Sequence, residues 1–289
     1  MNSPSTTVLV LGATGMLGNA VFRFLSATPG YRVIGSARSS RGLQHFDGDL
    51  RANVLTDVDV EQPDQLLSAI ERARPQVIIN CVGLVKQLAQ ADDPLTALPI
   101  NAMLPHRLAR LAAIAGARLV HVSTDCVFAG TRGAYKEVET PDATDLYGRS
   151  KLLGEVDYPH AITLRTSIIG HELSTAHGLV GWFLSQRTGI RGYTRAIFSG
   201  LPTVELARVM RDHVLPQPGL HGVYHVSSKP ISKHDLLRLV GQAYGHDIDI
   251  APDTSVSIDR SLDSSRFTGV TGYIAPDWPE LVQRMRAFG

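Results

Sequence analysis

The sequence predicts an α/β protein with a Rossmann-type, doubly wound parallel sheet. Short apolar segments alternate with helix-length amphipathic segments through the first two thirds of the 289 residues, which is the βαβ pattern of parallel sheets. In addition, the first apolar segment runs directly into a glycine-rich turn at 12–18 that opens a helix. Together these two observations favour a doubly wound sheet over a barrel or a sandwich.

The individual elements follow from hydrophobic periodicity. Apolar runs rich in Val, Ile and Leu predict strands, at 7–11, 32–36, 53–58, 76–81, 118–123 and 161–165. Segments with a helical apolar period lie between them and predict helices, at 16–27, 63–73, 94–115 and 145–157.

Beyond Thr166 the alternation loosens as far as Gly200 and then resumes. A helix is expected near 204–213, a strand at 223–227, a helix capped by Ser232 up to about 244, and a short helix at 279–288. We expect 247–277 to be irregular. The predicted organisation is a dinucleotide-binding Rossmann domain at 1–166, joined by the strand at 223–227, and a smaller, mainly substrate-binding region at 167–289.

The composition excludes several classes of protein. The 28 basic and 27 acidic side chains nearly cancel, so we expect no nucleic-acid partner. No apolar stretch approaches the length of a membrane span, and the polar residues 1–7 lack a secretory signal, which predicts a cytoplasmic protein with no membrane partner. Cys81 and Cys126 are the only cysteines and are interpreted as buried, reduced thiols, with no metal site expected.

The turn at 12–18 has the spacing of a loop that binds pyrophosphate. Glycines at i, i+3 and i+6 permit the tight turn, the approach of the phosphates and the packing of helix on strand, while helix N–H groups face the anion. A glycine-rich turn without a ligand is the alternative, which the placement between strand and helix disfavours. The cofactor is therefore expected at Gly12, Thr14, Gly15, Met16, Leu17 and Gly18.

The end of the second strand bears on the choice of cofactor. An NAD enzyme often carries an acidic residue here for the ribose hydroxyl, whereas this chain has Arg38 followed by Ser39. A guanidinium pairs with the 2′-phosphate of NADP, so we expect NADPH to be preferred over NADH. A solvated surface arginine is the alternative. Asp57, beside Val58, is expected to accept from the adenine amino group, or else to cap the following helix.

Tyr147 and Lys151 are four residues apart and so lie on one face of the predicted helix. An ammonium beside a phenol stabilises the phenolate and lowers a pKa that is ordinarily about 10. Tyr147 would then protonate a carbonyl oxygen as a hydride arrives. Such pairs also occur by chance on exposed helices.

Thr124 strengthens the case because it ends the strand at 118–123, on the edge where ligands of open α/β sheets bind. Its hydroxyl is placed to bond the same carbonyl oxygen. Taken alone, it would more readily be explained as satisfying a backbone group at the strand end.

At this point the chain resembles the extended short-chain dehydrogenase/reductase superfamily, through GATGMLG, INCVG, STD and YGRSK. The segments VHVSTDCVFAGTRGAYKE and LYGRSKLLGE are most similar to the branch of the dTDP-4-dehydrorhamnose reductases, which reduce 4-keto nucleotide sugars with NADPH or NADH. The resemblance implies Thr124, Tyr147 and Lys151 as catalytic residues, with Lys151 also bonding the nicotinamide ribose. It further implies a supporting role for Asn101, a homodimer, and a cofactor wall that includes Cys81, Val82 and Gly83.

Related proteins have three other functions. Related 4,6-dehydratases carry an acidic pair after the threonine, but Asp125 is followed by Cys126, which disfavours dehydration. Epimerisation of a nucleotide sugar stays open. So does a non-catalytic, NADP-binding role, because the regulatory subunit of methionine adenosyltransferase resembles this chain as well.

Substrate-binding residues are the least determined part of the prediction. Aromatic and basic side chains after Thr166 suit a base and a diphosphate, although Trp182 equally suits the core and the arginines equally suit a solvated surface. The expected set is Lys86, Asp125, His171, Trp182, Arg195 and Arg260.

Overall fold

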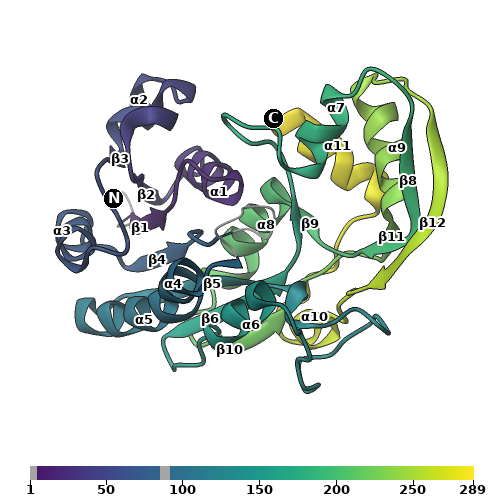
Figure 1. Cartoon of the computed structure of the whole chain (residues 1–289). Helices are drawn as coiled ribbons and strands as arrows, with labels where there is room; N and C mark the ends of the chain where they lie inside the picture. The colour runs from purple at the N-terminus through teal and green to yellow at the C-terminus, as the bar shows by residue number, and fades with distance from the viewer. Residues whose placement is uncertain (1–4, 85–91) are drawn as a thin grey trace.

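The computed structural model describes residues 5–84 and 92–289 and confirms the α/β fold with a parallel central sheet (Figure 1). Seven strands pair in the order β3-β2-β1-β4-β5-β6-β10, and every pairing is parallel. Their bounds are β1 Thr6–Leu11, β2 Tyr31–Ser36, β3 Val54–Leu55, β4 Val77–Asn80, β5 Arg118–Thr124, β6 Ala161–Thr166 and β10 Gly222–His225.

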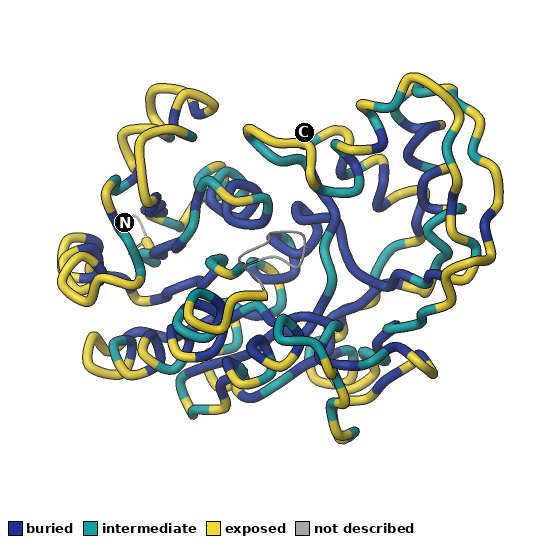
Figure 2. The backbone as a smooth tube through the Cα atoms, viewed as in Figure 1, coloured by how far each residue is buried: buried dark blue, intermediate teal, exposed yellow. Residues whose placement is uncertain are grey.

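Helices cover both faces of this sheet, and the sheet itself is the buried layer (Figure 2). On one face α3 and α5 pack apolar side chains onto β1, β4 and β5, as Leu66 and Leu108 do against Leu9 and Ile78. On the other face α1, α8, α9 and α11 share a second core with the sheet. The bounds are α1 Met16–Ser26, α3 Pro63–Ala73, α5 Leu104–Ala115, α8 Thr203–Val209, α9 Lys233–Tyr244 and α11 Trp278–Phe288.

The remaining short elements connect or extend these layers. They include η1, η4 and the π-helical segments η3 and η5, and α6, which leads from the end of β5 towards β6 (Figure 1). Their bounds are η1 Ser40–His45, α2 Gly48–Ala52, α4 Pro94–Ala97, η3 Leu98–Met103, η4 Asp125–Val127, α6 Leu146–Leu153, β7 Ile168–Ile169, α7 Leu179–Ser185, β9 Leu201–Pro202, η5 Met210–Val214 and α10 Ser265–Thr271.

A smaller sheet lies beside the central one, on the right in Figure 1. Its order is β11-β8-β12, with β12 parallel and β11 antiparallel to β8, and its bounds are β8 Ile190–Phe198, β11 Ile231–Ser232 and β12 Ile250–Asp259. The expectation of irregular structure at 247–277 was therefore wrong, since that stretch contains β12 and α10. Strand β12 was not predicted because most of its side chains are exposed and it contains Pro252. Its sequence therefore lacks the alternation of apolar and polar residues that indicates a strand.

The predicted long helix at 94–115 is divided. Pro99 and Pro105 interrupt it, and η3 separates α4 from α5. A proline inside a helix removes a backbone donor and clashes with the preceding turn, and π-helical turns commonly accommodate such irregularities. Two other predicted elements are shorter than expected: the helix at 145–157 ends at Leu153, and the strand at 53–58 is reduced to β3.

No helix in the described part of the chain is both long and apolar enough to cross a membrane. The strand order reverses beside β1, which lies between β2 and β4. In doubly wound sheets ligands bind beyond the carboxyl ends of the strands at this reversal. The ends of β1, β4 and β5 are therefore the place to look for a site.

Candidate functional site

The glycine loop after β1 has the geometry of a phosphate-binding turn. Gly12 has a φ of +78°, which an L side chain rarely adopts. A Cβ at Gly18 would lie 2.0 Å from the carbonyl oxygen of Gly12, so only glycine lets α1 pack this closely on the loop. Gly15 begins α1 without a side-chain cap, which leaves the N–H groups of the first turn for an anion, among them those of Met16 and Leu17.

The neighbouring wall of the loop comes from the end of β4. A Cβ on Gly12 would lie 3.0 Å from Val82 Cγ2, and Cys81 N donates to Leu11 O at 3.2 Å. The structure thus brings Cys81, Val82 and the glycine loop together. Burial raises the pKa of the Cys81 thiol to about 12, so the thiol stays neutral.

The residues expected around an adenosine ribose also lie beside the loop. Arg38 and Ser39 are exposed between β2 and η1. The segment η1 packs so closely on the loop that a Cβ on Gly42 would lie 2.8 Å from Thr14 Cγ2. Asp57 is exposed with a φ of +59°, and Val58 N donates to Ala37 O at 3.1 Å. An exposed guanidinium at this position is available to a phosphate.

Helix α6 brings Tyr147 to Thr124. Asp145 caps the helix by accepting from Gly148 N at 2.8 Å, and a Cβ on Gly148 would lie 2.3 Å from Cys126 O. The absence of that Cβ allows the first turn of α6 to lie directly against η4. Tyr147 is partly buried and lies beside Thr124, whose side chain acts on the phenol.

Thr124 itself is held in place by its neighbours on η4. Its Oγ1 accepts from Cys126 N at 3.1 Å and donates to Asp125 Oδ1 at 3.2 Å. The alternative role expected for Thr124, bonding a backbone group at the strand end, is therefore fulfilled. Thr124 lies beside Tyr147 as well.

Lys151 is buried one turn further along α6. Its Nζ donates to Val122 O at 2.8 Å, and a Cβ on Gly83 would lie 3.7 Å from the same Nζ. Asn101, in η3, accepts from Leu84 N at 3.0 Å through Oδ1 and donates to Ser150 Oγ at 3.2 Å. The π-helical turn thus fixes the segment after β4 against α6, a supporting arrangement of the kind expected for Asn101.

The expected depression of the Tyr147 pKa is wrong for this structure. Burial raises the pKa of Tyr147 above its ordinary value, and the effect of the Thr124 side chain, which lowers it, is too small to offset that increase. Lys151 instead has its own pKa lowered to about 8, because burial disfavours the ammonium more than the nearby Glu155 favours it. Desolvation outweighs the charge pair that sequence spacing suggested.

Asp125, beside Thr124, lies close enough to Arg260 for their charges to interact. Arg260 Nε donates to Phe128 O at 2.7 Å, and its charge, with that of Lys233, acts on the buried carboxyl of Asp125. Burial nevertheless raises the pKa of Asp125. Sequence analysis did not identify Lys233. A signal was available, because a cation in the first turn of a helix interacts unfavourably with the helix dipole and so does not serve helix stability.

The other expected substrate residues lie apart from this group. His171 Nε2 pairs with Tyr244 Oη at 3.0 Å, and its carbonyl accepts from Asn19 of α1 at 3.4 Å. Trp182 of α7 is 38% exposed, and Arg195 is exposed on β8. In the described part of the chain no hydrogen bond, ion pair or ring contact joins these three to Thr124 or Tyr147. Lys86 lies outside the described residues.

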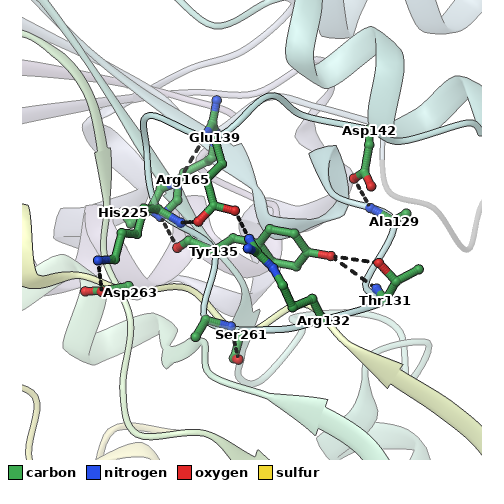
Figure 3. Close-up of polar contacts among 12 residues, drawn as sticks. Ala129, Thr131, Arg132, Tyr135, Glu139, Asp142, Arg165, His225, Ser261 and Asp263 are labelled. Carbon is green, nitrogen blue, oxygen red and sulfur yellow. Dashed lines mark hydrogen bonds and ion pairs between the residues drawn. The ribbon is translucent and has the colours of Figure 1, made fainter.

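The segment after η4 forms the outer edge of the site, and Figure 3 shows its polar contacts. Tyr135 stacks on Phe128 with ring centroids 4.2 Å apart, and Arg132 forms an ion pair with Glu139. Ala134 N donates to Ser261 Oγ at 2.9 Å. These contacts tie the segment to the residues around Arg260.

The fold and this arrangement at the ends of β4 and β5 agree with the class of protein that the motifs resemble, the extended short-chain dehydrogenase/reductases. Within it, the chain belongs to the RmlD substrate binding domain family, whose model matches residues 6–263.

Individual relatives agree with that placement. The chain is 28% identical over 269 residues to a probable low-salt glycan biosynthesis reductase of Haloferax volcanii, covering 89% of this chain and 86% of that one. It is 34% identical over 152 residues to methionine adenosyltransferase 2 subunit beta of Xenopus laevis, covering 53% of this chain and only 42% of that protein. The fold matches dTDP-4-dehydrorhamnose reductase from Bacillus anthracis in complex with NADP, with a TM-score of 0.79, 22% identity and full coverage of both chains.

Proposed function

We propose that the protein is an NADPH-dependent reductase of a 4-keto nucleotide sugar, similar to the dTDP-4-dehydrorhamnose reductases. The observation that carries the proposal is the placement of Tyr147 beside Thr124 at the end of β5, on the same helix as the buried Lys151. A proton donor, a second hydroxyl and a cation around one strand end are the groups that carbonyl reduction needs.

In this proposal each residue has one task. Thr124 orients the carbonyl oxygen of the substrate, and Tyr147 donates the proton to it. Because burial raises the pKa of Tyr147, the phenol carries its proton at neutral pH and is ready to act as an acid. Lys151 bonds the nicotinamide ribose and supplies the positive charge that favours the phenolate left after transfer.

The cofactor supplies the hydride to the carbonyl carbon. Gly12, Gly15 and the start of α1 would hold its pyrophosphate, and Arg38 with Ser39 would hold the 2′-phosphate, giving the preference for NADPH. Cys81 to Gly83 form the wall beside it, while Asp57 and Val58 flank the adenine. The tight packing at Gly18 and the uncapped first turn of α1 are the features that fit this group.

The substrate is proposed to lie against Asp125 and Arg260, which flank Thr124. His171, Trp182 and Arg195, which lie further away, and Lys86 are kept as candidates for the nucleotide portion, because a sugar nucleotide extends well beyond the reacting carbon. Lys233 joins this set as a cation near Asp125.

The test is a turnover assay with purified protein, NADPH and a panel of 4-keto nucleotide sugars, followed by the loss of reduced-nicotinamide absorbance. We expect turnover that disappears in Tyr147→Phe. Binding of NADPH without turnover of any panel member would contradict the proposal.

A regulatory role is the second candidate, favoured by the similarity to methionine adenosyltransferase 2 subunit beta. In that case the protein would bind NADP without reducing a sugar and would change the activity of a partner enzyme. Addition of the chain to a methionine adenosyltransferase assay, with and without NADP, separates the two candidates. Epimerisation would show as interconversion of sugars without net consumption of NADPH.

The proposal also includes a homodimer in the cytoplasm. Sedimentation of the purified protein tests the assembly, and a mass of about twice the chain's 31.3 kDa is expected.

A further inference from the structure

Glu155 is a buried carboxylate that lies directly behind the proposed reacting group. It follows Lys151 by four residues, just beyond the end of α6. Its Oε1 accepts from Ser123 Oγ at 2.7 Å, and Ser123 immediately precedes Thr124 on β5. The same carboxylate receives a forked pair of bonds from Arg165 of β6, Nε to Oε1 at 2.7 Å and Nη2 to Oε2 at 2.6 Å.

These contacts fix two adjacent strand ends to α6. Ser123 and Arg165 are partners in the β5–β6 register, so one carboxylate bonds side chains on both strands at the same level. The side chains of Arg165 and Glu155 are only 5% and 6% exposed. Two charges that are this deeply buried are stable only while they remain bonded to each other. Removal of one partner leaves the other charge buried and uncompensated.

Arg165 carries the connection onward to the outer edge of the site. Its Nη1 pairs with His225 Nε2 at 3.0 Å, and His225 Nδ1 pairs with Tyr135 O at 3.0 Å; the three residues lie together in Figure 3. The guanidinium also lies over the Phe128 ring, 5.3 Å from its centroid. Glu155 is therefore linked on one side to Thr124 and on the other to the segment that borders Arg260.

Glu155 is also the charge that faces Lys151. The other titratable groups that interact with this ammonium, beside β4 and on β5, are Cys81 and His121. Burial raises the pKa of the thiol to about 12, and it lowers that of the imidazole. Both groups are neutral near pH 7, so Glu155 is the negative charge that acts on Lys151 within the described residues.

We propose that Glu155 is a positioning residue for the Thr124, Tyr147 and Lys151 group: it fixes the strand end that carries Thr124 and supplies the negative charge that keeps Lys151 an ammonium. The first task is geometric, through Ser123 and Arg165. The second is electrostatic and concerns the protonation of Lys151. The consequence for catalysis rests on the proposed function, whereas the effect on Lys151 does not.

The direct test is the titration of Lys151 by NMR, with isotopically labelled lysine in the full chain and no substrate. The chain has five lysines, and Lys151→Met assigns the signal. In the unaltered protein we expect a midpoint of about 8. In Glu155→Gln the midpoint falls by about one pH unit. An unchanged midpoint would overturn the electrostatic part of the proposal.

Three further variants separate charge from geometry. Ser123→Ala removes one bond and no charge, so the midpoint of Lys151 stays in place. Glu155→Asp keeps the charge but retracts the carboxylate from Ser123, and it also serves if Glu155→Gln does not fold. Glu205→Gln is the matched control, because Glu205 is an equally buried carboxylate bonded by an arginine, Arg284 Nη1 at 2.6 Å. It should lower stability without moving the midpoint.

Kinetics then test the geometric part. For a substrate that is turned over, Glu155→Asp should reduce kcat about 10- to 100-fold with a small change in KM, as expected for misplaced reacting groups, while the alkaline limb of the pH profile stays in place. In Glu155→Gln that limb moves to lower pH together with the NMR midpoint. Unaltered kcat in Glu155→Asp would overturn the geometric part, and absence of turnover in the unaltered protein would count against the proposed function alone.

Discussion

Individual side chains in this protein behave according to burial more than according to spacing. Tyr147 and Lys151 lie four residues apart on α6, as the sequence predicts, yet burial raises the pKa of the phenol and lowers that of the ammonium. Sequence can place two groups on one helix face, but it does not state how much water surrounds them. The sign of a pKa shift depends on that second quantity.

The lowered pKa of Lys151 predicts a pH-dependent effect on stability. Folding lowers this pKa from 10.5 to about 8, so the buried ammonium destabilises the fold fully below pH 8, and the cost disappears as the pH rises past 10.5. Lys151→Met should therefore gain up to about 3 kcal/mol in the free energy of unfolding at pH 7.

Denaturant unfolding of both proteins at pH 7 and pH 10 measures this gain. The advantage of Lys151→Met should shrink at the higher pH. If the difference in the free energy of unfolding between the two proteins does not change with pH, the charge of Lys151 does not destabilise the folded protein.

Arg38 determines the expected preference for NADPH. Its exposed guanidinium follows β2 beside the glycine loop, and a charge-assisted bond to a phosphate contributes about 1.5 to 3 kcal/mol. Arg38→Ala should weaken NADPH binding about 10- to 100-fold and leave NADH binding nearly unchanged, as measured by fluorescence titration. The exposed Arg107 of α5 provides the control. Equal losses for both cofactors would contradict the role of Arg38.

At the scale of elements, the strands of the central sheet were predictable because they are buried along most of their length, and α1, α3 and α5 because each has a clear apolar side. The short elements η1 and α2 have few buried residues and were not predicted. The glycine loop was predictable for a different reason, since its residues are dictated by backbone geometry. Gly12 requires a positive φ and Gly18 a close approach. In contrast, β12 exposes most of its side chains, and a strand held by backbone pairing alone leaves little pattern in the sequence.

Gly18→Ala tests the packing of α1 against the loop. The added Cβ would lie 2.0 Å from Gly12 O, which is a backbone atom and cannot move without displacing the loop. We expect a loss of about 2 to 4 kcal/mol in the free energy of unfolding and a loss of cofactor binding. Gly48→Ala is the control, because a Cβ there meets no atom within 4 Å. Equal stability of the two variants would contradict this account of the loop.

At the scale of the whole molecule, the site combines residues that are far apart in the sequence. Asp125 lies at the end of β5, whereas Arg260 follows β12 and Lys233 begins α9. Motifs identified the residues close to the loop and the strand ends, because short spacings record local geometry. Which residues of the last third lie near Asp125 depends on tertiary packing, which short motifs do not record. For this reason sequence analysis did not identify Lys233, and it included aromatic and basic residues that make no bond to this group.

A partly buried ion pair joins the last helix to the rest of the chain. Glu205 of α8 is 1% exposed and accepts from Arg284 Nη1 of α11 at 2.6 Å and from Tyr273 Oη at 3.2 Å. Glu205→Gln should cost about 1 to 3 kcal/mol in the free energy of unfolding, since it replaces a charge-assisted bond from Arg284 by a neutral one. Glu280→Gln, which removes the exposed partner of the same arginine, should cost less than about 1 kcal/mol. Thermal unfolding of both variants checks the difference.

The central claim is that Tyr147, Thr124 and Lys151 reduce a sugar carbonyl with NADPH. The most direct measurement uses NADPH deuterated at the transferable position, together with dTDP-4-dehydrorhamnose and related 4-keto nucleotide sugars, with mass spectrometry and NMR of the product. We predict deuterium on the former carbonyl carbon, and at least a 100-fold slower transfer in Tyr147→Phe. Tight binding of NADPH with no deuterium in any sugar would contradict the account.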